Sequence, residues 1–214
     1  MVRTHHPEAD DQSLTPAESL ALIEATLRDT RGALGFSDWP FYLTWGIAWA
    51  VAFTFSHLVL ASDQAPLADL PEGYVGLAWL VCVGGAGVVT GLVIRRAAHG
   101  VSGTTARVGR RLGLCWSAAF LGASLLAGLW ELGDPDFGAL FVFVVALLYL
   151  GQGAAFLDDL QLGLGVWLLA VDIAALAAGL AWFNLILAVF GAGGMLVAAG
   201  LARRAQLRTG LEDG

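Results

Sequence analysis

Six long apolar stretches occupy most of this chain of 214 residues, and they limit what it can fold into. Each approaches the ~20 residues that a helix needs to cross a bilayer. Inside hydrocarbon, every backbone polar group must bond within its own segment, so we expect helices. The sequence therefore predicts an all-α membrane protein, with a bundle of six transmembrane helices in residues 36–202. The stretches are Phe41–Ser62, Gly73–Ile94, Leu112–Leu132, Gly138–Leu157, Gly163–Trp182 and Asn184–Leu201.

The composition agrees with a membrane protein and excludes several kinds of site. Hydrophobic residues make up 57% of the chain and charged residues only 14%, unlike the balance of a soluble domain. The chain has no lysine, so it can form neither a lysine Schiff base nor a Walker phosphate loop. No basic surface indicates a nucleic-acid site, and no HExxH or CxxC spacing indicates a metal. We therefore expect neither a cofactor nor an enzymatic activity.

The N-terminal region predicts a tail followed by an amphipathic helix. Residues 1–13 are polar and acidic, which is typical of disorder. Residues 14–35 are assigned to a cytoplasmic helix, which begins with a capping box of Thr15 and Glu18. We expect its apolar side chains to lie at the membrane interface or to be buried against the bundle or a partner. These side chains are Leu20, Ile23, Leu27 and Leu34.

Charges in the loops predict the orientation of the bundle. The segment 95–111 holds five arginines and the C-terminal segment 203–214 holds three. The loop 63–72 and the turn 133–137 hold acidic residues and no basic one. By the positive-inside rule, we expect both termini to be cytoplasmic. The absence of lysine and the abundance of Ala, Gly, Leu and Val indicate a GC-rich bacterial genome, so we expect the bundle in the plasma membrane of a bacterial cell.

Asp172 is the strongest candidate for a functional side chain. It lies at the centre of the fifth stretch, where a charge costs ~2.5–3.5 kcal/mol on insertion scales. Gly165 and Gly179 on its helix face predict close helix packing, so we expect Asp172 to face the bundle. Gly87 and Gly91, in the second stretch, have a spacing that also favours close contact. Asp172 would either handle protons or solute, or hold helices together through hydrogen bonds.

Other polar residues are predicted at related depths in the bundle. At ~1.5 Å per residue, Thr54 and Ser124 come within roughly 5 Å of the level of the central aspartate. Gln152 and Ser117 lie together about 7 Å nearer the cytoplasm on the same count. His57, toward the outer end of the first stretch, is interpreted as a hydrogen-bonding side chain. These residues predict either a polar path or a set of separate interhelical hydrogen bonds.

The start of the chain resembles a known group of proteins. ESLALIEATLRDTRGAL (Glu18–Leu34), followed by YLTWGIAW (Tyr42–Trp49), resembles the start of multi-pass membrane proteins of actinobacteria, which are loosely classed as transporters. An amphipathic helix ahead of six spans is also similar to the permease subunits of type-2 ABC exporters. The resemblance implies a transporter or a transporter component and assigns no site residues.

Two functions are compatible with these observations. The first is a transporter, or a component of one, that moves a small solute or is coupled to protons. The second is a non-catalytic scaffold or regulatory subunit, which binds a partner through the amphipathic helix and the arginine-rich loop. The lipid bilayer is the expected surrounding, and association with a second copy or with another protein stays open. A water-accessible cavity that reaches Asp172 would favour transport, and a dry, packed bundle would favour the subunit.

Overall fold

The computed structural model describes residues 15–23, 38–61, 65–71, 73–97, 103–133 and 135–212. It contains six helical segments that are long and apolar enough to cross a membrane, and a short helix at residues 16–23 precedes them. The prediction of an all-helical protein with six spans is therefore confirmed. The elements are α2 (Trp39–Leu60), α3 (Gly73–Ala97), α4 (Gly103–Leu129), α5 (Asp136–Phe156), α6 (Asp159–Ala178), and a sixth span composed of α7 (Leu180–Ile186), the π-helix η1 (Leu187–Gly191) and α8 (Ala192–Glu212).

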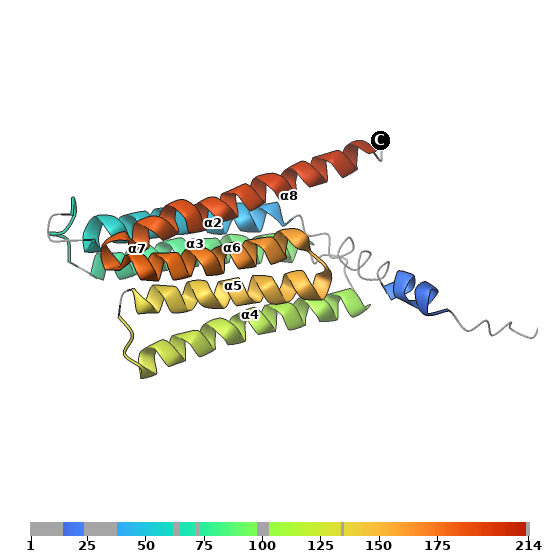
Figure 1. Cartoon of the computed structure of the whole chain (residues 1–214), viewed down its shortest axis with the longest axis horizontal. Helices are drawn as coiled ribbons and strands as arrows, with labels where there is room; N and C mark the ends of the chain where they lie inside the picture. Colours follow the sequence, from blue (N-terminus) through green and yellow to red (C-terminus); the bar gives the residue numbers. More distant parts are fainter. Residues whose placement is uncertain are drawn as a thin grey trace, which may run out of the picture.

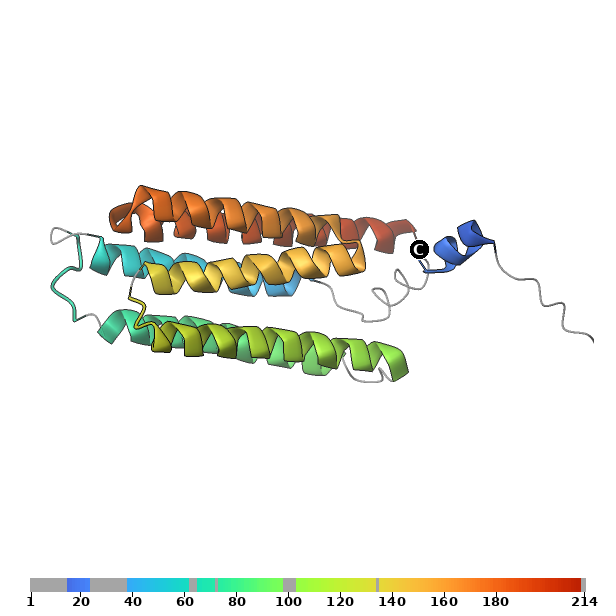
Figure 2. The same cartoon turned by 60° about the horizontal axis from the view of Figure 1, so that its bottom comes forward.

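The helices are arranged in three tiers, which Figure 2 shows from the side. In this view, α6 and the sixth span form one outer tier, α2 and α5 lie in the middle, and α3 and α4 form the other outer tier. Figure 1 shows that α4 lies beside α5 and apart from α3. α5 packs along α6, and α2 packs along α8 and α3. The short turns after the third, fourth and fifth spans predicted antiparallel neighbours. The packing of α4 on α5, α5 on α6 and α6 on α7 confirms this prediction.

The core lies between the middle tier and the tier of α6 and the sixth span. Its buried side chains come from α2, α5, α6 and the sixth span. Phe53 of α2 is 1% exposed, and its ring centroid lies 4.7 Å from that of Trp79 in α3 and 6.5 Å from that of Phe183 in α7. Both pairs are edge-to-face, a geometry that adds ~0.5–1.5 kcal/mol per pair beyond area burial. Phe53 therefore fixes α3 and α7 against α2.

The turn between α5 and α6 brings these two helices into close contact. Leu157 has a left-handed backbone (φ 53°), which ends α5. The carboxylate of Asp158 accepts hydrogen bonds from the N–H groups of Leu160 (3.0 Å) and Gln161 (3.1 Å), and it thereby caps α6. Such a cap stabilises a helix by about 1 kcal/mol.

The boundary that the hydropathy predicts between the fifth and sixth spans is wrong. The predicted stretch ran to Trp182, whereas α6 ends at Ala178 and α7 begins at Leu180. The chain turns at Gly179, whose φ of 81° is accessible to glycine without a steric penalty. Apolar residues continue through this turn, so hydropathy does not indicate where it lies. The turn depends on the conformational freedom of Gly179 instead.

α3 and α4 are the least buried spans. Of the 18 residues in the most apolar part of each span, 6% are buried in α3 and 11% in α4. The share is 33–39% in the other four spans. α3 packs on α2 and α4 packs on α5, but within the described residues α3 and α4 do not form a packed pair. The outer sides of these two helices are therefore available to lipid or to another molecule.

The N-terminal helix begins as the capping box predicts. The N–H of Thr15 donates to Oε2 of Glu18 at 2.8 Å, and the N–H of Glu18 donates back to Oγ1 of Thr15 at 3.3 Å. Leu20 and Ile23 are 58% and 56% exposed, so the expected burial against the bundle of the same chain does not occur at these two positions. Residues 1–14 and 24–37, with Leu27 and Leu34, lie outside the described residues.

Candidate functional site

Asp172 lies inside the bundle, on the inner face of α6. Its side chain is 3% exposed, and Leu168 and Ala175, one turn before it and one turn after it, are fully buried. Its Oδ1 atom has no hydrogen-bond partner in the described part of the chain. Among the described residues, no other Asp, Glu, Arg or His is buried. A charge at this position would lack the paired groups that normally offset the cost of burial.

Gly165 explains why this face of α6 is turned inward. A Cβ atom at Gly165 would lie 2.7 Å from the backbone N of Leu150 and 2.9 Å from the carbonyl O of Ala146. Gly153 in α5 is as tightly enclosed, by the backbone of Leu162. The two glycines let α5 and α6 approach closely, as small residues do in membrane bundles. Asp172, seven residues after Gly165, lies on the same side of the helix.

Asn184 is a second buried polar residue, which the sequence interpretation missed. It lies in α7, is 2% exposed, and its Nδ2 atom has no partner among the described residues. Counted from Gly179 at ~1.5 Å per residue, Asn184 lies about 8 Å and Asp172 about 10 Å from the turn. Two unpartnered polar side chains therefore occupy neighbouring depths on adjacent helices. The sequence could have indicated this residue, because Asn184 is the one amide side chain within the apolar stretch Asn184–Leu201.

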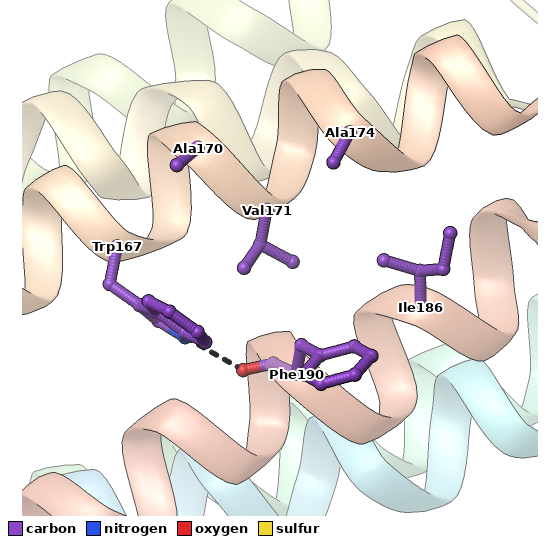
Figure 3. A pocket seen from close by; sticks show the side chains of 6 residues that line it. All are labelled: Trp167, Ala170, Val171, Ala174, Ile186 and Phe190. Atoms are coloured by element: carbon purple, nitrogen blue, oxygen red, sulfur yellow. Dashed lines mark hydrogen bonds between the residues drawn. The ribbon is translucent and has the colours of Figure 1, made fainter.

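The sixth span changes its hydrogen bonding just after Asn184. Residues Leu187–Gly191 form a π-helix, a feature that is rare and that often marks functional sites. Nε1 of Trp167 in α6 donates to the carbonyl O of Phe190 at 2.9 Å, which ties α6 to this segment (Figure 3).

A groove of about 320 Å³ opens between α6 and the sixth span at this segment. Figure 3 shows its lining, which is apolar except for the Trp167–Phe190 hydrogen bond. Val171 lines the groove, but Asp172 is turned ~100° around the helix from it and does not. The groove therefore provides no polar route to the carboxyl group. It is lined by Trp167, Ala170, Val171, Ala174, Ile186 and Phe190.

Three of the predicted interior residues lie on the outside of the bundle. Thr54, Ser117 and Ser124 are exposed. The hydroxyls of Ser117 and Ser124 donate to carbonyls of their own helix, those of Gly113 and Phe120. The depth count was not enough to predict proximity, because depth does not specify which side of a helix a residue occupies. The structure therefore does not bring these three residues together with Asp172.

A separate polar cluster lies at the end of the bundle that holds the α5–α6 turn. The Tyr42 hydroxyl lies beside the side-chain amide of Gln161, and the rings of Tyr42 and Tyr149 are 5.9 Å apart. Nε2 of Gln152 and Oε1 of Gln161 are buried without a partner in the described residues. Tyr149 is about 13 Å and Asp172 about 21 Å from Asp158 along the helices. The cluster is therefore about 8 Å from Asp172 in depth, with apolar packing between them.

At the opposite end, Ser56 and His57 follow each other in α2. The Ser56 hydroxyl donates to the carbonyl of Ala52 at 2.9 Å and accepts from Nε1 of Trp79 at 3.0 Å. Nδ1 of His57 is buried and has no partner within the described segments. His57 was predicted to be the hydrogen-bonding side chain at this end of α2. Its neighbour Ser56 makes these hydrogen bonds instead.

The predicted packing glycines differ in their surroundings. Gly165 lies in the α5–α6 contact, whereas Gly179 forms the turn before α7. A Cβ atom at Gly87 or Gly91 would meet no atom within 4 Å. These two glycines of α3 therefore face away from the packed helices of the chain.

Comparisons of the chain with protein families, with curated proteins and with solved structures found no match. Within the described residues, no three His, Cys, Asp or Glu side chains are grouped so that they could hold a metal ion. Asp172, an ionisable residue, and Asn184, an amide, are therefore two polar side chains buried within an apolar core.

Proposed function

We propose that this chain is a non-catalytic subunit of a membrane assembly, with a scaffolding or regulatory role. The observation that supports this best is the enclosure of Asp172. The carboxyl group is buried among apolar side chains. The groove on the adjacent side of α6 is apolar, and Asp172 is not among the residues that line it. Moving a polar solute or a proton requires water or a chain of polar groups, and apolar packing lies between Asp172 and the Tyr42 cluster.

The proposed orientation has both termini in the cytoplasm and the bundle in the plasma membrane. Arginines lie at the end of α3, in the first three turns of α4 and in the C-terminal part of α8, and these segments lie at the same end of the bundle (Figure 1). Asp69, Glu131 and Asp136 lie at the other end. The positive-inside rule places the arginine-bearing end in the cytoplasm.

The N-terminal helix supplies the proposed contact with a partner protein. Leu20, Leu22 and Ile23 are each more than half exposed. Residues 15–23 include no Arg, so anionic lipid would attract this part of the helix only weakly. An apolar groove on a partner is a better match for these side chains.

A matched pair of double variants tests this contact. Membranes from the native host would be solubilised gently, and the size of the complex measured by native gel electrophoresis. We expect Leu20→Asp/Ile23→Asp to reduce the complex to the size of the free chain. The control Glu18→Gln/Ala21→Asp, at two exposed positions on the opposite side of the helix, should leave it unchanged. A wild-type chain that migrates alone would contradict the proposal.

The second candidate function is proton-coupled transport. It is favoured by the unpartnered Oδ1 of Asp172 and the unpartnered Nδ2 of Asn184 at neighbouring depths. Proteoliposomes with a pH-sensitive dye inside would distinguish the two functions. The subunit proposal predicts no proton flux above that of protein-free liposomes. A flux that Asp172→Asn abolishes would establish transport instead.

A further inference from the structure

The hairpin formed by α3 and α4 carries charge of one sign only. From Gly73 to Trp130 the sequence has five arginines and no Asp or Glu. Two of the arginines end α3 and three lie in the first three turns of α4, so all five lie at the same end of the hairpin. Their side chains are exposed. They are Arg95, Arg96, Arg107, Arg110 and Arg111.

Beyond the arginines, the hairpin leaves apolar surface uncovered by the rest of the chain. A Cβ atom at Gly91 or Gly113 would meet nothing within 4 Å. On α4, Arg110, Gly113, Ser117 and Ser124 follow one another at helical spacing along one face. The hydroxyls of both serines are used by carbonyls of their own helix. This face therefore offers space and apolar contact but no free hydrogen-bond donor.

We propose that the α3–α4 hairpin binds an anionic phospholipid. The phosphate lies against Arg107, Arg110 and Arg111 of α4, whose planar guanidinium groups match phosphate oxygens, and an acyl chain lies along the small-residue face. The arginines end transmembrane helices, which is the level of lipid headgroups. A neutral lipid would bring no net opposite charge to the exposed Arg107, Arg110 and Arg111, and an acidic peptide would leave the apolar face uncovered. An anionic phospholipid complements both.

Lipid binding to the purified full-length chain tests the headgroup contact. Native mass spectrometry in neutral detergent would compare phosphatidylglycerol with phosphatidylcholine of the same acyl chains. We expect the wild type to bind phosphatidylglycerol more tightly. Arg107→Gln/Arg110→Gln should weaken this binding about thirty-fold, which corresponds to about 2 kcal/mol. The control variant Arg204→Gln/Arg208→Gln removes two exposed arginines of α8 and should change nothing.

A second pair of variants tests the acyl-chain contact without changing any charge. Gly91→Phe would fill the open face of α3, and we expect it to weaken phosphatidylglycerol binding about ten-fold, the equivalent of about two methylene groups. Gly200→Phe, at an equally open glycine of α8, is the control and should have no effect.

Three results would overturn the proposal. The first is equal affinity for the two lipids. The second is displacement of the lipid by an equal concentration of inorganic phosphate, which would reduce the site to an anion site. The third is a dimer that Gly91→Phe dissociates while lipid binding stays unchanged, which would assign the face to a second copy of the chain.

Discussion

Gly165→Ala should destabilise the bundle, although alanine is the better helix former. The new Cβ would lie 2.7 Å from the backbone N of Leu150 and 2.9 Å from the carbonyl O of Ala146. Backbone atoms of a packed helix cannot move aside as a flexible side chain does, and overpacking of this kind costs ~1–3 kcal/mol. The gain in helix propensity is about 1 kcal/mol, so we expect a net loss of about 0–2 kcal/mol.

Gly163→Ala is the matched control, two residues earlier in the same helix. A Cβ there would meet nothing within 4 Å, so the variant should gain up to about 1 kcal/mol from helix propensity. The two variants should therefore differ by about 1–3 kcal/mol, or about 2–12 °C in midpoint temperature. Thermal unfolding in one detergent, followed by tryptophan fluorescence, measures this difference. If Gly165→Ala proved as stable as Gly163→Ala, the close α5–α6 packing would be refuted.

Three further variants test other parts of the structure. Asp172→Leu should change the free energy of unfolding by less than about 1 kcal/mol, because Oδ1 has no hydrogen bond to lose; thermal unfolding checks this, and a larger loss would reveal a structural hydrogen bond. Hydrogen bonds from the backbone N–H and the hydroxyl of Thr15 hold the pKa of Glu18 below its usual value. The cap is therefore fully formed above the usual glutamate pKa and is lost as the pH falls through the lowered value; an NMR titration should show Thr15→Ala returning the Glu18 pKa toward normal, and no change would contradict the cap. Trp167→Phe removes the 2.9 Å hydrogen bond to the carbonyl of Phe190 and should lower the unfolding free energy by about 0.6 kcal/mol; an unchanged midpoint temperature would show that this bond does not stabilise the π-helix.

Much of the fold was predictable from the sequence. Six stretches of the right length, and the capping box at Thr15 and Glu18, predicted the helices because both depend on local residue patterns. The turn at Gly179 was not predicted. It lies in a continuous apolar run, where only the positive φ of one glycine distinguishes a turn from a helix.

The site was predictable only in part, because depth and helix face are different pieces of information. Asp172 was placed inside the bundle through the small residues on its face, and Gly165 does lie against α5. Thr54 had the right depth, yet it follows the buried Phe53 and is exposed. One residue is a rotation of ~100° around the helix, and only the packing of neighbouring helices specifies which side is inside.

The central claim is that water does not reach Asp172, and its accessibility can be measured directly. Cys82 and Cys115 would be replaced by serine and alanine, and a single cysteine introduced as Asp172→Cys, with Glu131→Cys as the exposed control. A membrane-impermeant maleimide would then be added to either side of sealed vesicles. We predict that Cys at position 131 is labelled and that Cys at position 172 is labelled from neither side. Labelling at position 172 at a rate comparable to that at 131 would contradict the account and would favour a transport path.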